Sequence, residues 1–488
     1  MKNNFFSLRF ALLMVLFLGT AYSTLAYDIV KDGIYYYIIG TEARVCDNGE
    51  NSYSGDVTIP AVFTHNGQTY LVTYICSGAF RDCTELKSVF IPNTVTVIAS
   101  GAFSGCTGLT HIELPSSITY IDLSTFSGCT GLTDVYIPRS VNAIYPNAFY
   151  GCTGLTSIGI PNSVTYIGDG AFMSCTGLKS VYLPNSITTI ERNTFLYCTG
   201  LENITIPNSV TTIGKHAFFN CTSLKSIEIP SSVTSIGVCA LNNCANLSSI
   251  TVSSSNEAYD SRENCNAIIE TASNTLIAGC QNSTIPVSVT AIGDYAYGGC
   301  LGLTTIDIPS TIASMGEGAF YGCTNLTNID IPKTITSIES STFSGCSSLK
   351  DITIPRFVTA IGDFAFYDCT NLIDVYSFII DPFEVSMGYY VFNVDGDNYS
   401  NRKLHVPSEA LQSYQVHESW APYFGSIVEM VPDQPGDVNG DNEVNINDIN
   451  SVVNIILDGN YSPDADVDGD GEVRMSDINS IINFILDN

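Results

Sequence analysis

Positive charge is scarce in this chain. It has 18 lysines and arginines against 48 aspartates and glutamates, which gives a formal net charge of −30. Such a surface repels phosphate backbones and anionic lipid headgroups, so we expect no nucleic acid partner and no electrostatic docking to membranes. An acidic excess of this size suits a divalent cation instead.

The residue types and motifs of common enzyme centres are also rare. The five histidines show no metal-ligand spacing, and no glycine-rich phosphate loop or nucleophile motif stands out. These histidines are His65, His111, His216, His405 and His417. We therefore predict no catalytic residues, no organic cofactor and no enzyme activity.

A hydrophobic run long enough to span a membrane is absent beyond the N-terminus. Lys2 and Arg9 precede the apolar run Phe10 to Leu18, and small residues around Ala26 suit a cleavage site. That run is shorter than the roughly 20 residues that cross a bilayer, although an uncleaved anchor is the alternative. We expect residues 1–26 to be a signal peptide and the mature protein, with no membrane span, to be secreted or on the cell surface.

A repeat dominates the rest of the chain. Twelve cysteines follow one another at a step of 23 residues, interrupted by one step of 56. They are Cys83, Cys106, Cys129, Cys152, Cys175, Cys198, Cys221, Cys244, Cys300, Cys323, Cys346 and Cys369. A fixed period in this range indicates a solenoid, in which each turn covers the apolar face of its neighbour.

The pattern within one repeat predicts two short strands and a turn. In residues 153–175 the segment "LTSIGIP" alternates apolar and polar residues, as a half-buried strand does, and Pro161 ends it. "SVTYI" is a second short extended segment, and "GDGAF" turns the chain back. The recurrent apolar positions are Leu155, Ile158, Ile160, Val164, Ile167, Phe172 and Cys175.

The cysteine slot is expected to hold buried thiols. In-register stacking places equivalent side chains about 4.8 Å apart, which does not forbid disulfides. Pairing would impose a period of two turns, however, and none is seen, so we predict reduced thiols that pack as small hydrophobes, with a disulfide ladder as the alternative. The total of 17 is odd, so at least one thiol is unpaired within the chain. Cys265 and Cys280 lie outside the ladder and are the expected pair.

The blocks "IPNSVTTIG", "AFxxC" and "TGLTSI" closely resemble the BspA-like leucine-rich-repeat family of bacterial surface proteins. The resemblance covers residues 54–376, with an irregular insertion at about 253–285 where "NAIIETASNTLIAGC" reads as a hairpin. Residues 27–53 look like an N-terminal β cap. Residues 377–430, with the single tryptophan Trp420 and a helix start in "PSEALQSY", look like the opposite cap.

The family resemblance implies binding of a host protein or glycan rather than catalysis. Equivalent outward positions on the first strand would form the binding face, and an ordinary solvated strand surface is the alternative. The outward positions include Tyr136, Tyr182, Glu228, Asp307 and Asp330.

An acidic module follows the linker at residues 431–436. Within residues 437–488, "DVNGDNEVNIND" and "DVDGDGEVRMSD" space oxygen donors at loop positions 1, 3, 5, 7 and 12, as calcium loops do. The second loop has no oxygen donor at position 9, where Arg474 stands, and Asn442 replaces the usual turn glycine of the first. We therefore predict two Ca²⁺ sites. The candidate ligands are Asp437, Asn439, Asp441, Glu443, Asn445 and Asp448 in the first, and Asp466, Asp468, Asp470, Glu472 and Asp477 in the second.

Two loops that each lead into an apolar helix, with aspartate at position 12 and no entering helix, resemble a type I dockerin. The resemblance implies a cohesin-like domain, or another surface protein, as the partner. The residues placed where dockerins meet cohesins are Asn447, Asn454, Ser476 and Asn483. Alternatively, the ions only hold a small module together.

The predicted fold is therefore mainly β: a leucine-rich-repeat solenoid with a β N-cap and an α/β C-cap, plus a small α-helical dockerin-like calcium-binding domain. The predicted function is an exported, non-catalytic binding or adhesion protein. The alternative is a non-catalytic component of a secreted polysaccharide-degrading cohesin–dockerin complex.

Overall fold

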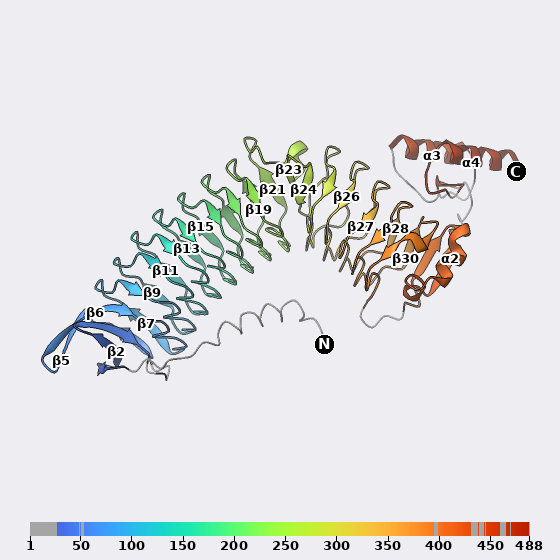
Figure 1. Ribbon diagram of the computed structural model, residues 1–488. Coiled ribbons are helices and arrows are strands. Elements are labelled where there is room, and N and C mark those ends of the chain that lie inside the picture. Colours follow the sequence, from blue (N-terminus) through green and yellow to red (C-terminus); the bar gives the residue numbers. More distant parts are fainter. Residues whose placement is uncertain are drawn as a thin grey trace.

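A curved stack of short strands makes up most of the molecule (Figure 1). The computed structural model describes residues 27–47, 49, 53–394, 399–430, 438, 444, 446–458, 465–468 and 470–487. The fold is a mainly β leucine-rich-repeat solenoid with a sheet at its N-terminal end and a small helical region at its C-terminal end, as predicted. None of the helices in the described ranges is both long and apolar enough to cross a membrane.

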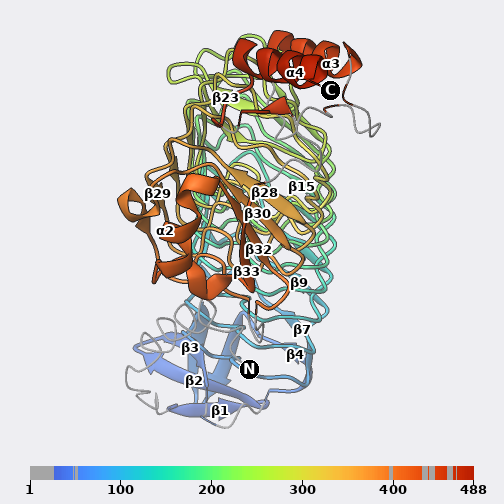
Figure 2. The same ribbon diagram turned by 90° about the vertical axis from the view of Figure 1, so that its right-hand side faces the viewer.

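Two columns of short parallel strands run along the stack, and successive turns superpose when it is viewed from its C-terminal end (Figure 2). The pairing register equals the sequence period, because Ser157 pairs with Ser180 and Ser180 with Asn203. The first column contains β7 (Leu86–Phe90), β9 (His111–Glu113), β11 (Asp134–Tyr136), β13 (Ser157–Gly159), β15 (Ser180–Tyr182), β17 (Asn203–Thr205), β19 (Ser226–Ile229), β21 (Ser249–Val252), β28 (Asp351–Ile354) and β30 (Asp374–Ser377). The second contains β8 (Val97–Ile98), β10 (Tyr120–Ile121), β12 (Ala143–Ile144), β14 (Tyr166–Ile167), β16 (Thr189–Ile190), β18 (Thr212–Ile213), β20 (Ser235–Ile236), β25 (Ala291–Ile292), β26 (Ser314–Met315), β27 (Ser337–Ile338), β29 (Ala360–Ile361) and β31 (Ser386–Met387).

The core of the solenoid is a column of stacked phenylalanine rings beside a column of thiols. Phe172 stacks on Phe149 with ring centroids 5.4 Å apart and on Phe195 at 5.7 Å. Ten of the twelve ladder thiols donate to a carbonyl of the preceding turn, as Cys175 does to the Phe149 oxygen at 3.1 Å. A thiol therefore contributes both apolar volume and a weak donor in this tight slot.

All 17 cysteines are free thiols. For the repeat ladder this agrees with the prediction of reduced thiols. The expected pair of Cys265 and Cys280 is wrong, since neither is bonded: the Cys280 thiol donates to the Asn266 oxygen at 3.4 Å, and the Cys265 sulfur lies 3.7 Å from the Ser261 hydroxyl. Local polar partners thus satisfy both sulfurs.

The N-terminal sheet closes the first end of the stack. Its strand order is β1 (Ile29–Lys31), β2 (Ile34–Ile39), β3 (Glu42–Cys46), β6 (Gln68–Ile75) and β5 (Val62–His65), while β4 (Gly55–Thr58) pairs with β7. This sheet includes strands beyond residue 53, where the cap was expected to end. The Tyr53 ring lies 4.4 Å from that of Phe80 and so covers the first ring of the phenylalanine column.

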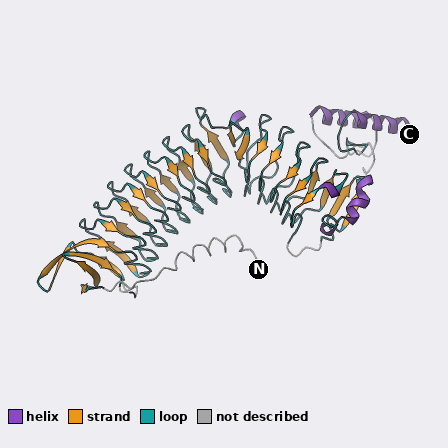
Figure 3. Ribbon diagram, in the orientation of Figure 1, coloured by secondary structure: helices purple, strands orange, loops and turns teal. Residues whose placement is uncertain are grey.

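The C-terminal turns close the other end and carry several short helical segments (Figure 3). Strands β32 (Lys403–Val406) and β33 (Ser426–Glu429) continue the first column, joined by α2 (Leu411–Val416) and flanked by the short 3₁₀ segments η2 (Pro382–Glu384), η3 (Ser408–Ala410) and η4 (Ala421–Tyr423). Trp420 is fully buried, and its ring lies 6.1 Å from that of Phe392, which stacks on Phe366 at 5.0 Å. The aromatic column is therefore capped at both ends.

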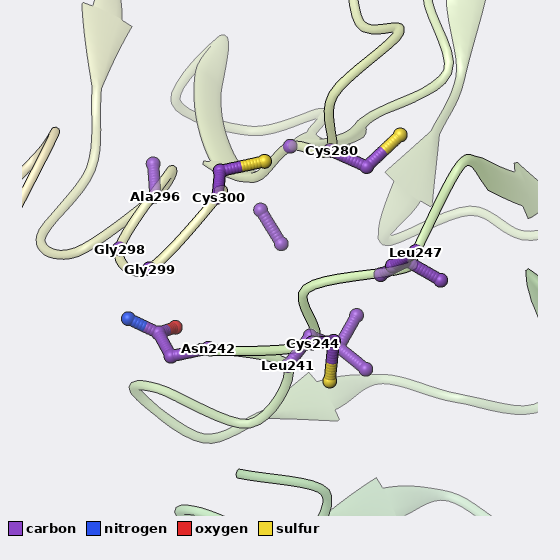
Figure 4. A pocket seen from close by; sticks show the side chains of 11 residues that line it. Leu241, Asn242, Cys244, Leu247, Cys280, Ala296, Gly298, Gly299 and Cys300 are labelled. Carbon is purple, nitrogen blue, oxygen red and sulfur yellow. The ribbon is translucent and has the colours of Figure 1, made fainter. Parts of the chain in front are cut away.

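An insertion interrupts the column in the middle of the solenoid. Strands β23 (Ile268–Glu270) and β24 (Thr275–Ala278) form the predicted antiparallel hairpin, preceded by β22 (Tyr259–Asp260) and η1 (Arg262–Asn264). Leu241 occupies the phenylalanine slot here, and the Asn243 N–H donates to the Gly298 oxygen at 2.9 Å, so the next regular turn stacks directly on this one. A small pocket remains at the junction, with Cys280 and Cys300 on one side and Leu241 and Cys244 on the other (Figure 4).

Candidate calcium site and exposed repeat surface

Two amphipathic helices form the scaffold of the C-terminal module. Helix α3 (Ile446–Asp458) and helix α4 (Met475–Asp487) carry apolar residues at a spacing of three and four, which places them on one face. The buried residues of this small core are Val452, Ala465, Ile478 and Ile481. Asp448 and Asp477 stand at equivalent positions in the first turns of the two helices, and both are fully buried.

The second predicted loop gathers three carboxylates around one point. Ligand oxygens of Asp466, Asp468 and Asp470 all lie within 4.8 Å of one another. Backbone N–H groups hold them there: Gly471 donates to Asp466 at 2.8 Å, and Glu472 donates to Asp470 at 3.0 Å. Gly471 has a φ of +83°, a conformation that glycine adopts without strain, and it allows the loop to turn at this point.

Asp477 completes the loop from the first turn of helix α4. Its two carboxylate oxygens accept from the N–H of Asp468 at 3.2 Å and from the N–H of Arg474 at 2.8 Å. Burial raises the pKa of this carboxyl above its ordinary value, which nearby cationic charge would counteract. The loop thus offers clustered hard oxygen donors, the chemistry that calcium requires.

Arg474 occupies the loop position where an oxygen donor was missing, and it pairs with the loop's own carboxylates. Its guanidinium contacts Asp470 and lies 3.1 Å from a carboxylate oxygen of Glu472. Burial alone would raise the pKa of Asp470, but the hydrogen bonds from Arg474 and from the Glu472 backbone lower it. An internal cation therefore already neutralises part of this site.

Most of the first predicted loop lies outside the described residues. This applies to Asp437, Asn439, Asp441, Glu443 and Asn445. Asp448 is described, and its carboxylate accepts from the Val438 N–H at 2.7 Å. Among the residues predicted to face a cohesin, Asn454 and Asn483 are exposed and Ser476 is half-buried, while the side chain of Asn447 is not among those described.

The repeat surface exposes side chains at the predicted outward positions. Tyr136 is 58% exposed and Tyr182 is 76% exposed, and Glu228, Asp307 and Asp330 are exposed too. Tyr136, Tyr182 and Glu228 lie on β11, β15 and β19, whereas Asp307 and Asp330 occupy the equivalent slots of turns in which this segment is extended but forms no named strand. The two tyrosines belong to earlier turns of the stack, and the three acidic residues belong to later ones.

A second aromatic surface follows the other strand column and was not predicted. The Tyr145 ring contacts that of Tyr120 at 5.6 Å and that of Tyr166 at 6.1 Å, both edge to face. Tyr120 and Tyr166 occupy one repeat slot, two turns apart, but Tyr145 comes from a different slot. Only the register of the folded turns brings the three rings together.

Of the five histidines, His405 and His111 pair with carboxylates of neighbouring turns. The His405 Nε2 lies 2.8 Å from an Asp374 oxygen, and the His111 Nδ1 lies 3.7 Å from Asp134. The His405 ring also stacks on Tyr376 at 4.4 Å. These are pairs between adjacent strands, and no nucleophile accompanies them in the contacts that the structure describes.

The stacked turns define a leucine-rich-repeat solenoid, and helices α3 and α4, with the carboxylate loop that precedes α4, form a small module that follows it in the chain. The family described as "BspA type leucine rich repeat region (6 copies)" matches residues 68–179, 142–268 and 273–393. The chain belongs to this family. The "dockerin type I domain" family matches residues 435–486, so the chain combines repeats of the BspA type with a C-terminal dockerin type I domain.

The chain is also similar to solved structures. A leucine rich cell surface protein from Faecalibacterium prausnitzii is 28% identical with a TM-score of 0.56, and the match covers 84% of this chain and 96% of that one. A leucine-rich repeat protein from Bacteroides ovatus is 30% identical with a TM-score of 0.49, covering 72% of this chain and 94% of that one. No curated protein matches the chain.

Proposed function

We propose that this protein is an exported, non-catalytic binding protein whose repeats bind a protein or glycan and whose dockerin attaches it, with calcium, to a cohesin-like domain or another surface protein. The observation that carries the proposal is the organised carboxylate loop of residues 466–477 in a dockerin domain on the same chain as the solenoid. The similar Faecalibacterium protein is described as a cell surface protein, which supports an extracellular location.

Calcium would be held at the second site by Asp466, Asp468, Asp470, the Glu472 carbonyl and Asp477. At the first site the corresponding proposal is Asp437, Asn439, Asp441, the Glu443 carbonyl, Asn445 and Asp448. Bound calcium supplies a positive charge that offsets the repulsion among these carboxylates. The chain itself orients the ligands, because backbone N–H groups donate hydrogen bonds to the carboxylates of Asp466 and Asp477.

The attachment role is tested by capture with the full-length chain. The protein without its leader is the bait for the organism's surface and secreted fractions, with calcium or with a chelator. We expect a calcium-dependent partner of cohesin-like β-sandwich type, lost in an Asp437→Asn/Asp466→Asn variant. The control variant Asp134→Asn, which changes an exposed solenoid carboxylate, retains the partner. A variant that loses calcium binding yet captures the same partner would refute the proposal.

The second candidate function, a non-catalytic part of a secreted polysaccharide-degrading complex, is favoured by the exposed tyrosines of the first strand column. A tyrosine ring has an apolar face and a polar hydroxyl group, a combination that suits binding to sugar rings. A glycan affinity that decreases in Tyr182→Ala but not in Tyr321→Ala would support this function. Tyr321 is the control because it is 45% exposed but lies on a turn outside the first strand column. Binding only to host matrix proteins would favour adhesion instead.

A further inference from the structure

A pair of cations stands at one place on the solenoid surface. In each regular turn one residue follows the proline that ends the first strand, and it is often asparagine or serine, as in Asn162 and Asn185. Two consecutive turns near the C-terminal end carry Lys333 and Arg356 in this slot instead. Together with Phe378 of the next turn, these residues form what we call the basic cradle.

The second loop of the dockerin lies against the basic cradle. The Arg356 Nη1 donates a hydrogen bond to the backbone oxygen of Asp470. At Gly471 a Cβ atom would lie 3.5 Å from the Phe378 ring and 3.6 Å from the Arg356 Cδ, so this glycine rests on both side chains. Figures 1 and 2 place helices α3 and α4 beside the outer edge of the arc, above its C-terminal turns.

The charges of the two surfaces are complementary. The loop carries the carboxylates of Asp466, Asp468, Asp470 and Glu472, and Arg474 is its single base. Burial lowers the pKa of Lys333, while the charges of Glu472, Asp466, Asp470 and Asp477 act to raise it. In a chain with 18 bases against 48 acids, two cations in the same slot of adjacent turns are a local concentration of positive charge, and Arg356 contacts the acidic loop.

We propose that the basic cradle is an intramolecular docking site for the second dockerin loop, and that docking and calcium binding at this loop oppose each other. Lys333 and Arg356 supply positive charge that the loop otherwise takes from a divalent cation. Calcium at the loop therefore faces two additional cations when the module is docked, and like charges at short range repel. Because binding couplings are reciprocal, calcium weakens docking by the same factor by which docking weakens calcium binding.

This inference rests on the proposed calcium binding and adds a state to it. Without calcium the module is held on its own solenoid, with loop residues 470–472 covered by the cradle. With calcium the loop is released and becomes available to a partner. The protein would thus attach only where calcium is abundant, as it is outside the cell.

Zero-length cross-linking of the full-length chain tests the docked state directly. A carbodiimide joins Lys333 to Glu472 or a neighbouring loop carboxylate, and mass spectrometry locates the bond. We expect this cross-link in chelator, its loss with calcium, and its loss in Arg356→Ala. Arg139→Ala is the matched control, because Arg139 occupies the same slot after Pro138 in a distant turn. The pair Lys225 and Glu202, 2.8 Å apart within the solenoid, is an internal standard that calcium leaves unchanged.

Calcium titration separates this inference from the proposed function. In Lys333→Ala/Arg356→Ala we expect the second site to bind calcium about three- to tenfold more tightly than in the wild type, with the difference shrinking at high salt. Arg139→Ala should match the wild type. Equal affinities in the double variant and the wild type, or a Lys333 cross-link insensitive to calcium, would refute the antagonism while leaving the calcium site intact. Absence of calcium binding at the second loop in every variant would refute the proposed function itself, and the antagonism with it.

Discussion

Replacing Phe172 by alanine tests whether the phenylalanine column stabilises the solenoid. The ring is fully buried between Phe149 and Phe195, and the planes of the three rings deviate by only 3° and 5°. Truncation removes the buried ring and leaves a cavity, a change that costs about 3–5 kcal/mol in protein cores. We expect a value in the upper part of this range, because strand pairing holds the neighbouring turns at a fixed spacing and limits their collapse into the cavity.

Urea unfolding measures this cost with two probes. Circular dichroism follows the whole solenoid, whereas fluorescence of the single tryptophan, Trp420, follows the C-terminal cap. Phe172→Leu copies the natural residue at position 241 and should cost less than Phe172→Ala, because it leaves a smaller cavity. Tyr182→Ala removes a ring that is 76% exposed and should change stability by less than about 0.5 kcal/mol. A loss for Phe172→Ala no larger than that for Tyr182→Ala would refute the reasoning.

Three further predictions follow from the thiols, the second calcium loop and the acidic strand face. Burial raises the pKa of Cys175 to about 12, so we expect the ladder thiols to resist a thiol reagent at pH 8 in the folded protein. All 17 thiols should react after denaturation. A much lower number of reactive thiols in the denatured protein would indicate disulfides. Arg474→Ser removes the cation paired with Asp470 and Glu472 and places an oxygen at loop position 9. Calorimetric titration should therefore show tighter calcium binding at the second site. An unchanged affinity would contradict the idea that Arg474 weakens calcium binding. Burial, then the charges of Asp307 and Asp351, raise the pKa of Asp330. Ionised Asp330 is therefore less favourable in the folded chain than in the unfolded chain. This cost in folding free energy is present in full above the folded pKa and absent below the unfolded pKa. Asp330→Asn should be more stable at pH 7 by up to about 0.5 kcal/mol, the difference vanishing in acid; a less stable variant at pH 7 would overturn this assignment.

The repeat period was enough to predict the architecture. Identical spacing of Leu155, Ile158, Phe172 and Cys175 in every turn leaves one arrangement that buries them all, which is in-register stacking. The observed register of Ser157 with Ser180 is the sequence period itself. The clustering of the Asp466, Asp468 and Asp470 carboxylates could be predicted for a similar reason, since donors close in sequence need only a tight turn to meet.

The cysteine pairing shows where reasoning from the sequence failed. Cys265 and Cys280 were singled out because both lie outside the repeat period, but position outside a pattern carries no information on distance or direction. In the folded insertion each sulfur lies beside its own local polar group.

The sequence by itself determined the solenoid, its hairpin insertion and the carboxylate cluster of Asp466, Asp468 and Asp470, because short-range spacing encodes which residues must be buried or brought together within a turn. The tertiary structure decided the rest: the tyrosine surface of Tyr120, Tyr145 and Tyr166, and the placement of Asp470 on Arg356, 114 residues away in the chain. These contacts depend on how separate turns and domains lie in space. A local sequence pattern does not contain the relative positions of residues that lie in different turns or domains.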